Sequence, residues 1–106
     1  RWRTSFENLL EKIRKHSPNK IFCLCYLELC RPSLSETVDD LTDNNPKISN
    51  ITIHPIFLSA GVHFNNDIKT MVFNLQSIYP HLKFKINDVV GNNSIVSNAI
   101  LKVVTS

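Results

Sequence analysis

The sequence predicts an α/β fold in three layers, with a mainly parallel sheet lying between helices. Apolar runs typical of strands alternate with segments of helical periodicity, in the order α-β-α-β-α-β-α. The 106 residues are 42% hydrophobic and 20% charged, values that suit a globular domain able to bury its own core. No internal repeat or low-complexity linker divides the chain. We therefore predict a single domain over residues 1–106.

The first half of the chain is expected to hold a helix, a strand and a second helix. Apolar side chains recur at helical spacing over residues 1–16, and a Ser-Pro-Asn cluster ends that helix. Residues 21–29 (IFCLCYLEL) form a continuous apolar run, typical of a strand covered on both faces. Ser33 and Glu36 then have the spacing of a capping box, which predicts a second helix followed by a loop over 42–49.

The second half is expected to hold two more strands and two more helices. Residues 51–58 are predicted to form a buried strand, and 66–79 a helix that Pro80 ends. Apolar residues suggest a final strand near 83–90. The turn at 91–93 then leads into a last helix.

The three cysteines, Cys23, Cys25 and Cys30, are predicted to be reduced thiols of the core. An odd number argues against a disulfide framework, and their spacing is not that of a standard zinc site. In a strand, Cys23 and Cys25 would share one face.

Bulk properties exclude several classes of function. A net charge of +3 is too small and scattered to indicate a nucleic-acid partner. No apolar run reaches the ~18 residues of a membrane span, and no signal peptide is visible, so we expect a soluble, cytoplasmic protein with no membrane partner. With two glycines the chain cannot carry a dinucleotide fingerprint, and it has neither a phosphate-binding loop nor a nucleophile elbow.

The best candidate for chemistry is His63. The carboxyl ends of parallel strands meet at one edge of a sheet, so the predicted loops 28–33, 58–66 and 89–93 should converge there. An imidazole at this edge can ligate iron, cobalt, nickel or zinc and can act as a base near neutral pH. Gly61 is expected to let the backbone turn where a Cβ would obstruct it. The alternative is a loop histidine that bonds only to backbone.

Other polar residues are expected at the same edge. Glu28 ends an apolar strand, so its carboxylate either faces the edge or is solvated. Arg31 either meets a substrate carboxylate or is solvated, and Ser59 lies in the same cluster of loops. Asp67 is placed in the first turn of the third helix, where a capping role competes with a functional one. His54, inside the predicted strand, is assigned a structural role.

These residues carry a resemblance to a known family. Residues 55–63 (PIFLSAGVH), followed by Asp67, resemble the small CbiX/SirB-type sirohydrochlorin chelatases, whose pattern is close to P-L/I-F-L-x-x-G-x-H-x-x-x-D-I/L. Residues 26–29 and 32–34 (YLEL and PSL) are similar to the F-L-E-x-x-x-P-S-L segment of these class II chelatases. The family is related to cobaltochelatase and ferrochelatase. The resemblance implies a chelatase-like, flavodoxin-like topology.

The resemblance also implies a reaction. Family members insert cobalt or ferrous iron into sirohydrochlorin, on the way to cobalamin or sirohaem, and the small members are homodimers. His63 matches a metal-binding and catalytic histidine, and Glu28 matches a carboxylate at the same edge. Arg31, Ser59 and Asp67 would then contact substrate. No organic cofactor is implied, because the divalent metal is itself a substrate.

The sequence departs from the family in one respect. A second histidine of the family lies in an H-G-S segment after its first strand, and neither that strand nor that histidine is among the 106 residues. We expect the chain to be a fragment of a longer reading frame, or another segment to take the place of the strand. A non-catalytic domain that binds tetrapyrrole or metal is the alternative function. A flavodoxin-like signalling domain is a third interpretation, which the absence of an acidic cluster disfavours.

Overall fold

The computed structural model describes residues 2–106, which form an α/β fold with a small parallel sheet. The chain divides into two compact units, Arg1–Pro46 and Lys47–Ser106, and each is described by itself. The predicted α/β class is confirmed, although residues 2–106 form two strands where three were expected. No helix among the described residues has both the length and the apolar character needed to cross a membrane.

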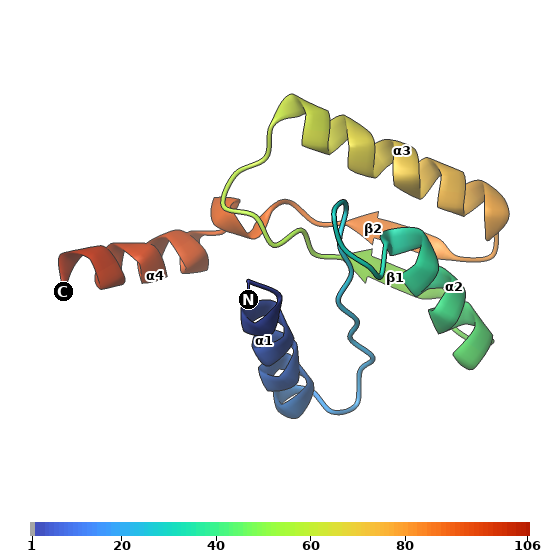
Figure 1. The fold of residues 1–106 in the computed structure, drawn as a ribbon, viewed down its shortest axis with the longest axis horizontal. Coiled ribbons are helices and arrows are strands. Elements are labelled where there is room, and N and C mark those ends of the chain that lie inside the picture. Colours follow the sequence, from blue (N-terminus) through green and yellow to red (C-terminus); the bar gives the residue numbers. More distant parts are fainter. Residues whose placement is uncertain (1) are drawn as a thin grey trace. The chain divides into compact units, whose positions relative to one another are not determined.

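The first unit contains two helices, α1 (Trp2–His16) and α2 (Leu34–Asn44), as Figure 1 shows in blue and teal. Helix α1 is confirmed with nearly its predicted bounds. Arg14, Lys15 and His16 lie in its last turn, where positive charge is favourable beside the free carbonyl groups.

Helix α2 begins at the predicted capping box. The Ser33 hydroxyl accepts a hydrogen bond from the Glu36 amide at 3.1 Å, and a Glu36 carboxylate oxygen accepts one from the Ser33 amide at 2.9 Å. Two N–H groups at the helix start are thereby satisfied. Leu34 and Val38, four residues apart, are buried.

The predicted strand over 21–29 is wrong. Residues 21–25 have no regular structure, a single bridge joins Tyr26 to Ser33, and bends follow as far as Pro32. Leu29, at φ 68°, occupies the left-handed region that glycine favours. An apolar run records a preference for burial, whereas a strand also needs a neighbour to pair with. Residues 2–46 contain no such neighbour.

The cysteines are affected by the same correction. Cys23 is exposed, while Cys25 and Cys30 are half-buried, so the prediction of three core thiols is wrong. Burial raises the pKa of the Cys25 thiol.

The second unit contains the sheet, formed by β1 (Asn50–Ile53) and β2 (Lys83–Ile86). The strands are parallel, as predicted, with Ile51 opposite Phe84. Both are shorter than the predicted runs 51–58 and 83–90. In each strand exposed residues alternate with half-buried ones, so the expected burial of 51–58 is also wrong. Pro55 lacks an N–H and cannot extend the ladder as a donor.

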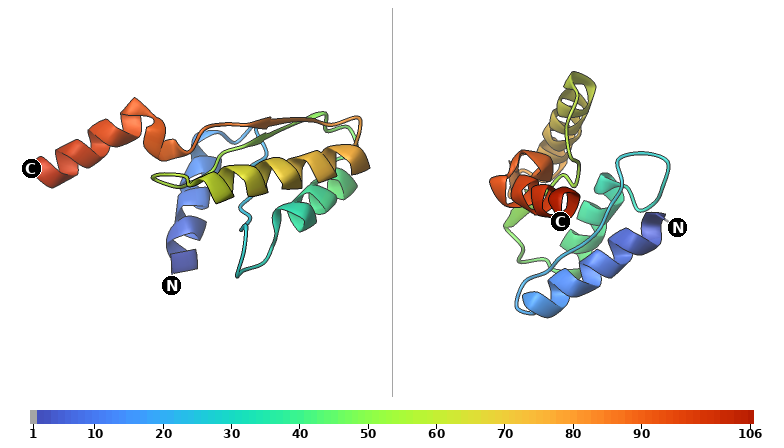
Figure 2. Two further views of the ribbon diagram at one scale, coloured as in Figure 1. Left: turned by 90° about the horizontal axis from the view of Figure 1, so that it is seen from above. Right: turned by 90° about the vertical axis from the view of Figure 1, so that its left-hand side faces the viewer.

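Helix α3 (Val62–Ile78) lies beside the β1–β2 pair in Figures 1 and 2 and contacts β2. It buries Ile68 and Leu75, which are on one face because they are two helical turns apart. It begins at Val62 rather than near residue 66, so the predicted loop 58–66 is shorter than expected.

The chain ends in the 3₁₀-helix η1 (Val90–Asn92) and helix α4 (Ser94–Thr105), as predicted from the turn at 91–93. The Asn93 side chain caps α4 by accepting a hydrogen bond from the Ile95 amide at 2.8 Å. Within residues 47–106, η1 is the one element that α4 contacts, and Figure 2 shows α4 extending away from the sheet of that unit.

Candidate active site

The segments that leave β1 and β2 run side by side beyond the sheet. Backbone hydrogen bonds continue the pairing after the strands end, from Asn87 N to Ile53 O at 2.9 Å and from Val90 N to Pro55 O at 3.1 Å. The Gly91 amide extends the series to the Phe57 carbonyl at 3.0 Å. The predicted meeting of these two strand-exit loops at the carboxyl edge of the sheet is therefore confirmed.

Gly91 makes the close approach possible. A Cβ atom at this position would overlap the carbonyl group of Leu58, so only glycine fits without a shift of backbone. The prediction made for the other glycine is wrong. Gly61 has an ordinary φ of −84°, and a Cβ there would meet nothing within 4 Å.

His63 lies in the first turn of α3, not in a loop, which corrects the sequence-based prediction. Gly61 is the N-cap, so His63 is the second residue of the helix, and it is exposed. The next residue, Phe64, packs against Phe57 with ring centroids 4.8 Å apart. This aromatic contact ties the start of α3 to the loop that leaves β1.

The earlier start of α3 also changes the position of Asp67. It lies in the second turn of α3, so the prediction that it sits in the first turn, with a capping role there, is wrong. His63 and Asp67 are four residues apart on one helix, which puts both on the same face, and both are exposed. Ser59 is also exposed, in the loop just before Gly61.

Arg31 and Glu28 lie in the first unit. Arg31 Nε donates to Glu36 Oε1 at 3.2 Å, and Arg31 Nη2 forms an ion pair with Glu36 Oε2. Together with the Ser33 backbone, Arg31 lowers the pKa of Glu36 to about 2, and Glu36 in turn raises the pKa of Arg31. Glu28 is exposed on the bend next to Leu29. Their approach to His63 stays a prediction.

Known proteins that are similar to this chain identify the protein family to which it belongs. The CbiX family model matches residues 1–106. The chain belongs to the CbiX family. It is also similar, at 28% identity, to the crystal structure of a CbiX protein of cobalamin (vitamin B12) biosynthesis from Marinobacter aquaeolei VT8. That match has a TM-score of 0.81 and covers 97% of this chain and 82% of the other. None of the curated proteins matches the chain.

Membership of the CbiX family gives the chain a role related to tetrapyrrole chelation. Among residues 2–106, no group of three or more histidine, cysteine, aspartate or glutamate side chains could hold a metal ion.

A polar network that was not predicted from the sequence lies at the same edge of this CbiX chain. The Asn87 amide nitrogen lies 3.1 Å from His54 Nδ1, in line with the structural role predicted for His54. Asp88 accepts hydrogen bonds from the Val89 amide at 2.8 Å and from the Asn92 side chain at 3.0 Å. These residues line a cavity of about 480 Å³. Their position directly after β2 is the signal that could have found them.

Proposed function

We propose that this CbiX-family chain inserts Co²⁺ or Fe²⁺ into sirohydrochlorin, with His63 as metal ligand and proton acceptor. The observation that supports this most directly is the exposed His63 in the first turn of α3, next to the carboxyl edge of the sheet. A side chain on a helix whose start is fixed by an aromatic contact, here between Phe57 and Phe64, keeps its direction better than one on a free loop.

The proposed reaction requires both a ligand and a base. A divalent metal replaces two protons on the pyrrole nitrogens, so the macrocycle gains the metal and releases two protons. A neutral imidazole can ligate the incoming ion and, after passing it on, accept one of these protons. In this proposal Glu28 takes the second proton, since a carboxylate is the other base at the edge in the family resemblance.

The substrate's carboxylates need partners on the protein. We assign this role to Ser59 and to the part of the Arg31 guanidinium that does not face Glu36. The first N–H groups of α3, near His63, also favour negatively charged groups. Asp67 would orient the imidazole of His63 rather than bind an anionic carboxylate.

The test is insertion of Co²⁺ or Fe²⁺ into sirohydrochlorin, followed by the change in visible absorbance. His63→Ala should reduce insertion to the uncatalysed rate, whereas His81→Ala, which removes an exposed histidine of the turn before β2, should leave it unchanged. Insertion that survives His63→Ala would reject the site. No insertion by the unmodified chain would reject the enzyme.

The alternative is a domain that binds tetrapyrrole or metal without inserting it. One observation favours it: residues 2–106 contain no group of three or more histidine, cysteine, aspartate or glutamate side chains that could hold a metal ion. Binding of sirohydrochlorin that quenches its fluorescence, with no later metal insertion, would support this alternative. The same solutions examined by sedimentation would test the homodimer that the family resemblance implies.

A further inference from the structure

The side chain of Arg3 lies against the backbone of Arg31 in the first unit. Arg3 is in the first turn of α1, and its Nη2 donates a hydrogen bond to the carbonyl oxygen of Arg31 at 3.4 Å. The fold of this unit therefore brings a second guanidinium next to Arg31, the residue to which we assigned a carboxylate of the substrate.

Arg31 has already committed one edge of its guanidinium. Its Nε donates to Glu36 Oε1 at 3.2 Å and its Nη2 pairs with Glu36 Oε2, in the single ion pair found among residues 2–106. A two-point contact of this kind occupies the fork that would otherwise receive a carboxylate of a ligand. Arg31 therefore has only its remaining edge to offer to a polycarboxylate.

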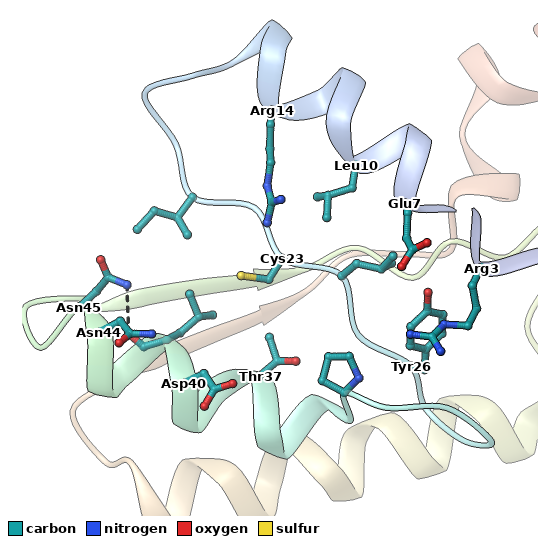
Figure 3. A pocket seen from close by; sticks show the side chains of 14 residues that line it. Arg3, Glu7, Leu10, Arg14, Cys23, Tyr26, Thr37, Asp40, Asn44 and Asn45 are labelled. Carbon is teal, nitrogen blue, oxygen red and sulfur yellow. Dashed lines mark hydrogen bonds between the residues drawn. The ribbon is translucent and has the colours of Figure 1, made fainter. Parts of the chain in front are cut away.

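The guanidinium of Arg3 is held in place without being neutralised. It lies over the Tyr26 ring, 5.6 Å from the centroid, in a cation–π contact that can be followed in Figure 3. Trp2 packs edge-on against the same ring, with centroids 5.4 Å apart. Glu7 is one helical turn further along α1, yet within residues 2–106 it forms no ion pair with Arg3.

The chemistry of Arg3 indicates which group it would bind. The side chain is exposed, and its hydrogen bond to the Arg31 carbonyl leaves most of its five N–H groups available. This planar fork matches a carboxylate, and a side chain that is already positioned loses less freedom when it binds one. A tetrapyrrole with several carboxylates can then place two of them on two neighbouring guanidinium groups.

We propose that Arg3 is a substrate-binding residue of this CbiX chain, which holds one carboxylate of the tetrapyrrole while the free edge of Arg31 holds another. Tyr26 is a positioning residue, because its ring fixes the direction of the Arg3 guanidinium. Since the ligand is the tetrapyrrole, this inference rests on the proposed function, but it concerns binding of the substrate and not the chemistry at His63.

The first test measures binding of sirohydrochlorin to the full chain without metal, from the quenching of its fluorescence. Arg3→Ala should raise the Kd about tenfold, because a charge-assisted contact is lost. Lys12→Ala removes an exposed positive charge from the same helix and is the matched control, which should change the Kd by less than about twofold. Arg3→Lys keeps the charge but not the planar fork, so its Kd should lie between these two.

The second test separates binding from chemistry in the insertion of Co²⁺ or Fe²⁺. Arg3→Ala should raise KM and leave kcat nearly unchanged, because a carboxylate remote from the pyrrole nitrogens is bound equally in the ground state and the transition state. His63→Ala should lower kcat instead. A chain that binds sirohydrochlorin but inserts no metal would reject the proposed function, and the Kd values would still decide the role of Arg3.

The positioning role of Tyr26 has its own pair of variants. Tyr26→Leu removes the ring under the guanidinium and should raise the Kd about threefold. Tyr26→Phe keeps the ring and should leave the Kd unchanged. An equal rise in both variants would show that the ring does not position Arg3.

Three results would overturn the proposal. An unchanged Kd in Arg3→Ala would show that Arg3 holds no carboxylate. An equal rise in Lys12→Ala would show a general attraction by the positive charges of α1 instead of a defined contact. Absence of any sirohydrochlorin binding by the unmodified chain would reject both this proposal and the proposed function.

Discussion

Gly91 lies against the backbone of Leu58, so closely that the two strand-exit loops leave no room for a Cβ atom at Gly91. The Gly91 amide also donates to the Phe57 carbonyl at 3.0 Å. The packing of the loop that precedes His63 is thus set by a glycine remote in sequence.

Substitution of Gly91 should therefore destabilise the chain. Gly91→Ala forces backbone to shift and is expected to lower the free energy of unfolding by about 1–3 kcal/mol, measured by urea denaturation. The control is Gly61→Ala, where the Cβ points into open space and the change should stay within about 0.5 kcal/mol. Equal effects of the two substitutions would contradict the close contact between Gly91 and Leu58.

The contact between Phe57 and Phe64 should hold the start of α3 in place. In a double-mutant cycle of Phe57→Ala and Phe64→Ala, we expect a coupling energy of about 0.5–1.5 kcal/mol. Phe73, a highly exposed residue later in α3, provides the control cycle with Phe57 and should give no coupling. Additive effects of Phe57→Ala and Phe64→Ala would show that the two rings do not support each other.

Glu36 should make the stability of the chain depend on pH in the acid range. Its pKa falls from 4.5 to about 2 because Arg31 and the Ser33 backbone stabilise the carboxylate. A carboxyl group with a lowered pKa in the folded state stabilises that state above its ordinary pKa. This contribution is therefore complete above pH 4.5 and is lost as the pH falls towards about 2.

The measurement is the urea midpoint at several pH values between 6 and 2 (roughly the range over which the contribution is lost). Glu36→Gln should flatten the profile, with a lower midpoint near neutral pH and little difference near pH 2. Glu11→Gln, an exposed position on α1, should leave the profile unchanged. An unaltered profile in Glu36→Gln would mean that the ion pair with Arg31 does not act in solution.

Asp67 should influence the reaction through His63, its neighbour one turn earlier on α3. If Asp67 orients the imidazole, Asp67→Asn should lower the rate of metal insertion about 10- to 100-fold. It should also weaken Co²⁺ binding at His63 by a similar factor, while Asp43→Asn, near the end of α2, should change neither. Loss of stability with an unchanged Co²⁺ affinity would assign Asp67 a purely structural role.

Local signals predicted several elements correctly because short-range interactions decide them. The capping box of Ser33 and Glu36 uses groups three residues apart, so its geometry follows from the sequence itself. The helical spacing of α1 and the turn before α4 are equally local. The alternation of strands and helices predicted the parallel pairing of β1 with β2, since the connection between them is a crossover through α3.

The start of α3 was predicted too late for a specific reason. Val62 and His63 precede the clearest apolar periodicity, and Gly61 carries no side chain that could mark a cap. The earlier start of the helix matters at the site. His63 and Asp67 are neighbours on one face of α3, whereas the sequence placed His63 in a loop and Asp67 in the capping turn of the helix.

The sequence by itself determined the α/β class, the likeness to the CbiX family and the identity of His63 as the candidate residue. These depend on residue types and on spacings of a few positions. Only the tertiary structure decided that residues 21–25 form no strand within residues 2–46, that Gly91 touches Leu58, and that His63 belongs to α3. Each of these three features depends on which groups lie beside the residue or segment in space. A short stretch of sequence does not record whether a suitable partner is there.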